Sequence, residues 1–168
     1  MADADPYMFH QTPAELAKEL VGFVDLSDTD VLCEPFRGEG AFYNAFPAVN
    51  PKLWGEIKKG VDYRDISGGY DWVITNPPFR LETGGKRVNA FWYLLDYYTQ
   101  RARKGVAFLA NDRCFATLTP RRVDLLKTRG WGIQRIVVCS VKKWRGRYFF
   151  VILTRTGDSF FNHLLTNY

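Results

Sequence analysis

Apolar residues recur along the chain with two spacings, and each spacing predicts a different kind of element. Apolar residues three and four positions apart indicate the buried face of a helix, and short apolar runs closed by turn residues indicate a buried strand. The runs predict six strands, within residues 29–36, 52–60, 70–79, 106–112, 133–141 and 147–155. The helical spacing predicts four helices, within residues 12–26, 38–46, 89–105 and 119–130.

Residues typical of helix ends define the limits of these helices. Thr12 is a candidate N-cap of the first helix, with Pro13 at the first helical position. Asn89 is a candidate N-cap of the third helix, and Gly105 is expected just past its end.

Strands that alternate with helices predict a Rossmann-like, doubly wound α/β fold with a mostly parallel sheet. Only the short segment KKWRG joins the last two strands, so they are expected to form an antiparallel C-terminal hairpin. A length of 168 residues suits one domain, residues 1–168. Ligands of such sheets bind at the carboxyl ends of the strands. The informative loops are therefore residues 34–40, 55–57, 62–65, 75–88, 110–120 and 141–147.

Charge is divided unevenly between the two halves of the chain. The net charge is +5, but residues 1–79 contain 6 Lys/Arg and 13 Asp/Glu, whereas residues 80–168 contain 17 Lys/Arg and 5 Asp/Glu. Aromatic residues make up 16% of the sequence and are interleaved with the basic residues of the second half. This combination favours a polyanionic partner such as nucleic acid, although basic residues also solvate ordinary surface helices.

Several classes of protein are disfavoured by the composition. Cys33, Cys114 and Cys139 are widely spaced and form no CxxC pair, so neither a zinc site nor a disulfide framework is expected. His10 and His163 are isolated, and no metal dependence is predicted. The N-terminus is acidic, unlike a signal peptide, and no run approaches the ~20 apolar residues of a membrane span. We expect a cytoplasmic or nucleoid-associated protein that is not secreted and binds no membrane.

The segment EPFRGEG follows the first predicted strand and carries an acid and two glycines, Glu34, Gly38 and Gly40. Glycines there permit a tight turn and a close approach of ligand to backbone. The spacing matches neither the dinucleotide fingerprint GxGxxG nor a phosphate loop. An acid at the start of the turn suits a cationic or hydroxyl-bearing nucleotide-like ligand. An ordinary strand-to-helix turn is the alternative.

Two further acids lie after predicted strands of the first half. Glu56 follows the second strand, about 20 residues beyond the glycine turn, where a carboxylate can accept both hydroxyls of a ribose. Asp62 could accept a hydrogen bond from an adenine amino group, and Tyr63 could lie along the adenine ring. The alternatives are an exposed surface acid and a polar loop with one packed tyrosine.

The segment TNPPF, residues 75–79, ends the third predicted strand with two prolines and an aromatic ring. Proline donates no backbone hydrogen bond and has a fixed φ, so the strand must stop here. The Asn76 side chain and the Pro77 carbonyl would form two fixed acceptors for an exocyclic amino group, and Phe79 would stack on the heterocycle. Such hydrogen bonds favour sp³ geometry at nitrogen, so its lone pair could attack an electrophile without a strong base.

This set of motifs resembles the S-adenosylmethionine-dependent amino-methyltransferases with an NPPF motif, in particular the N6-adenine DNA methyltransferases. The resemblance runs from about residue 9 to about residue 154 and follows the motif order of that family. It implies a seven-stranded sheet, S-adenosylmethionine as cofactor, and catalysis by Asn76, Pro77, Pro78 and Phe79. It also implies that the cofactor is bound by Phe9, Thr12, Glu34, Phe36, Gly38, Gly40, Glu56, Asp62 and Tyr63. Phe9 and Thr12 would lie near the methionine moiety, and Glu34 near its amino group.

Two features depart from the family pattern. Arg37 stands where the family often has a small residue, so its side chain must turn away or serve an unusual role. Many DNA-modifying members carry a separate target-recognition domain, and a chain of 168 residues is not expected to contain one. Recognition of the target sequence would then be loose, or short loops, a specificity subunit or a second copy of the chain would supply it.

Two basic loops are expected on the substrate face of the sheet, one after NPPF and one between the last two strands. Their lysines and arginines would bind phosphates, and the tryptophan would stack on or wedge a base. Ordinary solvated turns are the alternative. The residues concerned are Arg80, Lys86, Arg87, Lys142, Lys143, Trp144, Arg145 and Arg147. A base of duplex DNA would have to be flipped out to reach Asn76.

The sequence therefore predicts methyl transfer from S-adenosylmethionine to the N6 amino group of adenine in DNA. Adenine in RNA, an exocyclic amine of cytosine or guanine, and a protein glutamine amide remain alternatives on the same fold. A methyltransferase-like subunit that binds nucleic acid without catalysing a reaction is the alternative from another class.

Overall fold

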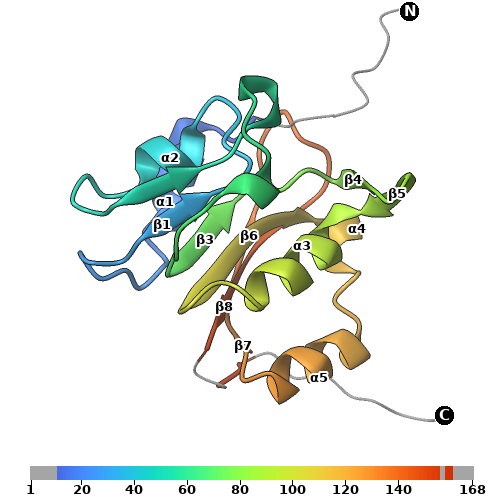
Figure 1. Ribbon diagram of the computed structural model, residues 1–168. Helices are drawn as coiled ribbons and strands as arrows, with labels where there is room; N and C mark the ends of the chain where they lie inside the picture. The colour runs from blue at the N-terminus through green and yellow to red at the C-terminus, as the bar shows by residue number, and fades with distance from the viewer. Residues whose placement is uncertain (1–10, 156–157, 161–168) are drawn as a thin grey trace, which may run out of the picture.

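A six-stranded sheet with helices on both faces forms the centre of the computed structural model, which describes residues 11–155 and 158–160 (Figure 1). Its strands are β1 (Leu32–Glu34), β2 (Lys52–Trp54), β3 (Trp72–Thr75), β6 (Gly105–Asn111), β7 (Gly132–Cys139) and β8 (Tyr148–Thr154). The order across the sheet is β2-β1-β3-β6-β8-β7. Neighbours from β2 to β6 are parallel, and β8 is antiparallel to both β6 and β7. The predicted α/β fold and the C-terminal hairpin are thus confirmed.

The seven-stranded sheet implied by the family resemblance is wrong for the described residues. The main sheet has six strands, as the apolar runs predict, and a separate antiparallel pair lies outside it, β4 (Arg80–Thr83) with β5 (Lys86–Asn89). Beyond the edge strand β2, residues 55–71 lead to β3 through two 3-10 turns, Ile57–Lys59 and Tyr63–Asp65. This connection contains no apolar run that could add a strand at the edge.

Alternating side chains of the central strands build two separate cores, one on each face of the sheet. In β6, Val106, Phe108 and Ala110 enter one core, whereas Ala107 and Leu109 enter the other. Because both faces are covered, this strand is a continuous apolar run rather than an alternating one.

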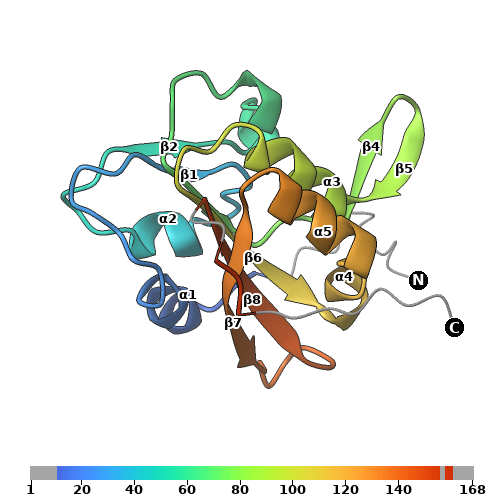
Figure 2. The same ribbon diagram turned by 90° about the horizontal axis from the view of Figure 1, so that it is seen from below.

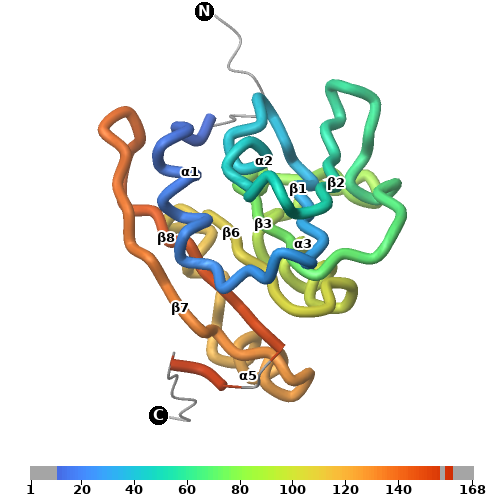
Figure 3. Tube along the Cα trace, turned by 90° about the vertical axis from the view of Figure 1, so that its left-hand side faces the viewer, coloured from blue at the N-terminus to red at the C-terminus, as the bar shows by residue number. Residues whose placement is uncertain are grey.

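The helices of the two faces come from different parts of the chain. The first face carries α1 (Ala14–Val21) and α2 (Ala41–Ala45), which Figure 3 shows side by side in front of the sheet. The opposite face carries α3 (Ala90–Thr99), α4 (Asp112–Phe115) and α5 (Pro120–Thr128), which Figure 2 shows together on one side. The short helix α4 was not predicted.

One predicted helix cap is confirmed and another is wrong. Asn89 caps α3, because its Oδ1 accepts a hydrogen bond from the Phe91 amide at 3.1 Å. Thr12 does not cap α1, whose N-cap is Pro13 without a side-chain hydrogen bond. The Thr12 hydroxyl instead accepts a hydrogen bond from the side chain of Asn76.

Gly105 does not follow the end of α3 as predicted, but begins β6. A Cβ at this position would lie 2.1 Å from the Trp72 ring of the neighbouring strand. Glycine is therefore required here by close packing within the sheet rather than by a helix end.

Ion pairs close the sheet at the amino ends of its parallel strands. Asp30, which is 1% exposed, precedes β1 and pairs with Lys104 before β6. Asp71 precedes β3, accepts a hydrogen bond from the Val31 amide at 2.8 Å and pairs with Arg103 at 2.9 Å. The Arg103 guanidinium holds the pKa of Asp71 below its ordinary value. These acids link the starts of three strands.

Candidate active site

Two glycines with left-handed backbone build the turn between β1 and α2. Gly38 and Gly40 have φ values of 51° and 89°, which residues with a side chain rarely adopt. The Gly40 amide donates to the Arg37 carbonyl at 2.7 Å, and Gly40 is the N-cap of α2. A Cβ at Gly38 would meet nothing within 4 Å, so this side of the turn is open to a ligand.

Glu56, after β2, holds the glycine turn in place. Its Oε2 accepts a hydrogen bond from the Gly38 amide at 2.7 Å, and its Oε1 accepts one from the Lys58 amide at 3.0 Å. The Glu56 residue is 4% exposed, so the alternative of an exposed surface acid is wrong. The structure brings this predicted residue directly against the glycine turn.

Gly55 joins the same two loops and was missed by sequence reasoning. Its amide donates to the Glu34 carbonyl at 3.0 Å, and its carbonyl accepts from the Arg37 amide at 2.8 Å. A Cβ on Gly55 would lie 2.8 Å from the Pro35 carbonyl oxygen, so only glycine fits. The requirement is steric and involves a loop distant in sequence, which explains why no local signal marks it.

Glu34 ends β1 beneath the glycine turn and is only 2% exposed. Its Oε2 accepts a hydrogen bond from the Tyr43 amide at 2.6 Å, and no ion pair involves it within residues 11–155 and 158–160. Burial, reinforced by the Glu56 carboxylate, raises the pKa of Glu34 to about 9, against the opposing effects of the Tyr43 amide and Arg37. A buried acid of this kind favours binding of a cation, which would stabilise its ionised form.

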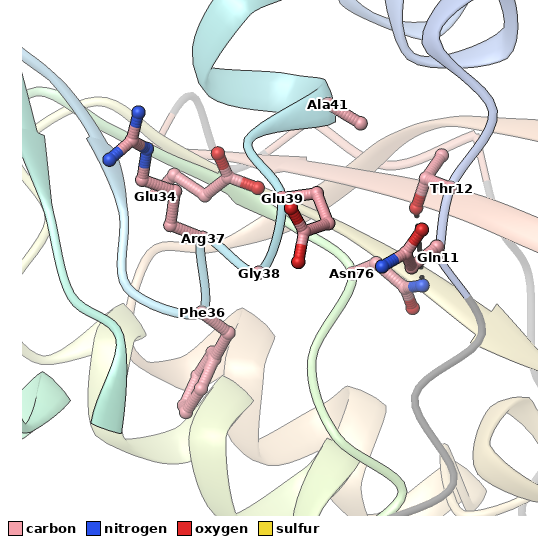
Figure 4. Close-up of a pocket in the computed structure, with 9 residues that line it drawn as sticks. All are labelled: Gln11, Thr12, Glu34, Phe36, Arg37, Gly38, Glu39, Ala41 and Asn76. Carbon is pink, nitrogen blue, oxygen red and sulfur yellow. Dashed lines mark hydrogen bonds between the residues drawn. The ribbon is translucent and has the colours of Figure 1, made fainter. Parts of the chain in front are cut away.

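The Arg37 side chain turns away from the ligand side of the turn, as its bulk at this position requires (Figure 4). Its guanidinium carbon lies 4.5 Å from the centroid of the Tyr43 ring and 5.0 Å from that of the Trp54 ring. Such cation–π contacts stabilise a guanidinium away from water. The guanidinium therefore supports the glycine turn from behind, although Arg37 also contributes to the pocket lining.

A pocket opens between the glycine turn, the segment before α1 and the end of β3 (Figure 4). Its cavity of about 60 Å³ is lined by Gln11, Thr12, Glu34, Phe36, Arg37, Gly38, Glu39, Ala41 and Asn76. Asn76 directly follows β3, and its Nδ2 donates to the Thr12 hydroxyl at 3.2 Å. Figure 4 shows Gln11, Thr12 and Asn76 on one side of the pocket, with Glu39 and Gly38 facing them. The pocket therefore joins the NPPF segment to the glycine turn.

Three lining residues, Gln11, Glu39 and Ala41, were missed by sequence reasoning. Glu39 lies between the two glycines of the turn, so its position in the motif could have identified it. Gln11 could not be found in this way, because it is placed by the packing of α1 on the sheet. Two carboxyl groups, Glu34 and Glu39, and one arginine, Arg37, are thus among the lining residues.

Phe36 and Tyr63 form an aromatic pair beside the pocket, with ring centroids 5.3 Å apart. Burial raises the pKa of Tyr63 to about 12. Asp62 is held by its neighbour Arg64, whose amide and Nε both donate to its Oδ1 at 2.8 Å. The same Arg64 side chain lowers the pKa of Asp62. Asp62 and Tyr63 lie outside the pocket lining, so an adenine ring near them would extend beyond the cavity itself.

The NPPF segment leaves the sheet directly after β3, as its prolines predict. Pro77 is buried, whereas Pro78 and Phe79 are half-buried. The Phe79 side chain packs against both cores, and its carbonyl accepts a hydrogen bond from the Ala90 amide at 3.1 Å. The segment is therefore firmly packed between the two faces of the sheet.

The two basic loops lie at the same end of the sheet (Figure 1), well apart from each other (Figure 2). The first was expected to be a loop, but it forms the antiparallel β4–β5 ribbon. The predicted basic residues are exposed in both: Arg80, Lys86, Arg87, Lys142, Lys143, Arg145 and Arg147. Trp144 is half-buried, with its ring centroid 4.5 Å from that of Tyr148. The Arg147 Nε atom lies 3.7 Å from Asp112 Oδ1.

The remaining predictions concern residues and ligands that the structure addresses only in part. Phe9 lies outside the described residues. No group of three or more His, Cys, Asp or Glu side chains suited to a metal occurs in the described part of the chain. None of the described helices is both long and apolar enough to cross a membrane.

This chain is similar to known proteins in structure but not detectably in sequence. No protein-family model and no curated protein matches the sequence. A structure described as the modification subunit of a type I restriction enzyme from Vibrio vulnificus YJ016 has a TM-score of 0.67 and 15% identity, covering 94% of this chain and 46% of that one. One described as an RNA methyltransferase from Pyrococcus horikoshii has a TM-score of 0.63 and 14% identity, covering 86% and 85%.

A third structure, described as a class I S-adenosylmethionine-dependent methyltransferase from Listeria monocytogenes, has a TM-score of 0.61 and 11% identity, covering 84% of this chain and 58% of that one. Some of the similar structures were solved with bound S-adenosylmethionine. This chain therefore has the fold of S-adenosylmethionine-dependent methyltransferases, and it spans less than half of the Vibrio subunit.

Proposed function

We propose that this chain transfers a methyl group from S-adenosylmethionine to the N6 amino group of adenine in DNA. The observation that carries the proposal is the position of Asn76, which directly follows β3 and lines the pocket beside the glycine turn. Its Nδ2 donates to Thr12 at 3.2 Å, so the amide has a defined orientation, with Oδ1 as its acceptor. A hydrogen-bond acceptor at this place can hold an amino group against the cofactor.

The residues around the pocket fit S-adenosylmethionine, which carries an ammonium and a sulfonium group. Glu34 is a buried acid that forms no ion pair among the described residues, and the cofactor's ammonium would supply a cationic partner. Glu39 adds a second carboxylate on the same side. Gly38 leaves the turn open, and the two Glu56 oxygens each retain a lone pair for a ribose hydroxyl after accepting one amide.

Phe36 and Tyr63 would offer apolar surface to the adenine of the cofactor. Asp62 can contribute to the same site only if it shares its carboxylate with Arg64, which donates to both of its oxygens. The adenine end is therefore the less organised end of the proposed cofactor site.

Bound S-adenosylmethionine would supply an electrophilic methyl group for in-line displacement. In this proposal Asn76 Oδ1 and the Pro77 carbonyl each accept one hydrogen of the target amine, and Phe79 stacks on its ring. The two hydrogen bonds hold the nitrogen lone pair toward the pocket, and the amine proton leaves after the transfer. These residues act by positioning and by preorganised electrostatics rather than by removing a proton first.

A polyanionic substrate is supported by charge. Seven exposed lysines and arginines lie on the two hairpins at the pocket end of the sheet: Arg80, Lys86, Arg87, Lys142, Lys143, Arg145 and Arg147. Cations in such an arrangement can bind phosphates on both sides of an extruded base.

The decisive experiment is incubation of the protein with methyl-labelled S-adenosylmethionine and DNA, followed by mass spectrometry of the released nucleosides. We expect N6-methyladenine. Asn76→Ala should lower the rate by about 10³-fold, because it removes an acceptor used in the transition state. Cofactor affinity, measured by calorimetry, should change by less than about threefold, since Asn76 holds the substrate amine and not the cofactor.

Gln134→Ala, which removes an amide side chain from the distant edge strand β7, is the matched control and should leave the rate unchanged. Label in cytosine would overturn the assignment to adenine, and label only in RNA would overturn the assignment to DNA. An active Asn76→Ala variant would refute the mechanism. Absence of cofactor binding would favour a non-catalytic nucleic-acid-binding subunit.

A further inference from the structure

The β4–β5 pair is a two-stranded ribbon that stands apart from the main sheet. Gly84 and Gly85 form its turn with φ values of 56° and 72°, the left-handed conformation that a tight two-residue hairpin turn requires. Figure 2 shows the ribbon projecting beyond the start of α3. At about 3.4 Å per residue, its four-residue strands are about 14 Å long.

The two faces of the ribbon differ in polarity. The cross-strand pair Leu81–Val88 is half-buried, and Leu81 packs against the core beneath α3. The pairs Glu82–Arg87 and Arg80–Asn89 alternate with it and lie exposed on the other face. This alternation fixes the orientation of the ribbon, with the charged face turned outward.

We propose that the ribbon reads base pairs beside the target adenine through the DNA major groove, and that Arg87 recognises guanine there. This inference rests on the proposed function. The major groove is about 12 Å wide and admits a two-stranded β-ribbon. Arg80 directly follows Phe79, so the base of the ribbon lies beside the catalytic segment. Arginine donates two hydrogen bonds to the O6 and N7 atoms of guanine, the commonest base-specific contact.

Glu82 distinguishes this ribbon from a surface that only binds phosphates. A carboxylate facing a polyanion weakens binding, so phosphate binding alone does not account for it. It lies directly opposite Arg87 in the register of the ribbon, where unlike charges attract each other. In this proposal Glu82 is therefore a positioning residue for Arg87. By contrast, the turn between β7 and β8, residues 140–147, contains Lys and Arg but no acid, which suits phosphate contacts.

The test is to methylate a DNA library with randomised bases around adenine and to sequence the methylated products. We expect the wild-type protein to prefer guanine at one position within a few base pairs of the adenine. Arg87→Lys keeps the charge but loses the planar fork, so the ratio of rates for guanine over other bases should fall about tenfold. The salt dependence of DNA affinity should stay unchanged in this variant, because the number of cations is conserved.

Glu82→Gln should lower the same ratio by a smaller factor while strengthening overall DNA binding. Arg121→Lys on α5, which Figures 1 and 3 place at the opposite end of the molecule, is the matched control and should leave the ratio unchanged. If adenine in DNA is methylated but Arg87→Lys retains the wild-type ratio, the inference is wrong and the proposed function stands. If no adenine in DNA is methylated, the proposed function itself fails.

Discussion

The buried acids at the two ends of the sheet differ in whether they form ion pairs. At the amino ends of the strands, Asp30 and Asp71 each have a cationic partner, Lys104 and Arg103. At the carboxyl ends, Glu34 is equally buried and accepts one backbone hydrogen bond, with no ion pair among the described residues. The acids of the first end each have a cationic partner, whereas Glu34 and the neighbouring buried acid Glu56 accept only backbone hydrogen bonds and form no ion pair among the described residues.

This difference distinguishes acids that stabilise the fold from an acid that can gain a cationic partner from a ligand. A buried acid paired with a cation stays ionised and stabilises the fold, so the pKa of Asp71 is lowered by Arg103. A buried acid without a cation is held in its neutral form, so burial raises the pKa of Glu34 to about 9. Only the second acid gains a partner when a cationic ligand binds, and it lies in the pocket beside the glycine turn.

The largest effect is expected at the amino ends. Asp71→Ala should lower the free energy of unfolding by about 3 kcal/mol, because the Val31 amide and Arg103 lose a charged acceptor. Chemical denaturation measures this loss, and cofactor affinity should stay unchanged under conditions where the variant is folded. Asp71→Asn is the matched control and should cost about 1 kcal/mol, since it keeps an oxygen for Val31. Equal losses in both variants would show that the ion pair dominates the hydrogen bond.

At the carboxyl ends, Glu34→Gln should lower the affinity for the cofactor and not the stability of the fold, the reverse of what is expected for Asp71→Ala. Gln keeps an acceptor for the Tyr43 amide but cannot ionise, so the affinity for S-adenosylmethionine should fall about thirtyfold. The free energy of unfolding of the variant, relative to that of the wild type, should increase as the pH rises. The raised pKa of Glu34 gives the wild type a contribution that is complete below the ordinary carboxyl pKa and is lost as pH rises through about 9. The variant, which lacks this titration, should therefore become relatively more stable between pH 5 and pH 9.

The same residue predicts a proton release that calorimetry can measure. At about pH 6.5 an α-amino group is protonated, so its binding beside neutral Glu34 should expel about one proton. Calorimetry in two buffers with different ionisation enthalpies counts this proton, and Glu34→Gln should release none. A wild-type protein that binds cofactor without releasing a proton would place the ammonium elsewhere.

The fold could be predicted from sequence where a single pattern determines an element, as in the apolar runs of β3, β6 and β8. The ribbon was missed because its strands alternate charged and apolar residues over only four positions around two glycines, which a flexible loop also permits. The first helix was extended too far, to residue 26. It ends at Val21, and the next buried residue, Val24, belongs to the following turn.

The candidate site was predicted only as far as its residues share short motifs. Glu34, Gly38 and Asn76 lie in such motifs, and the structure brings them to one pocket. The contact of Asn76 with Thr12 spans 64 positions and could not be inferred from local spacing, which instead favoured Thr12 as a helix cap. Contacts of this kind depend on the packing of α1 against the sheet.

Removal of the Thr12–Asn76 hydrogen bond should give the smallest of the expected effects. It tests whether Thr12 orients the Asn76 amide at the carboxyl ends of the strands. Thr12→Val removes the hydroxyl that accepts from Asn76 Nδ2 but keeps the shape of the side chain. The amide would lose this one contact, so kcat should fall about fivefold, a cost of about 1 kcal/mol for one hydrogen bond. Thr12→Ser retains the hydroxyl and should restore kcat. A valine variant with normal kcat but weaker cofactor binding would mean that Thr12 serves the cofactor rather than the orientation of Asn76.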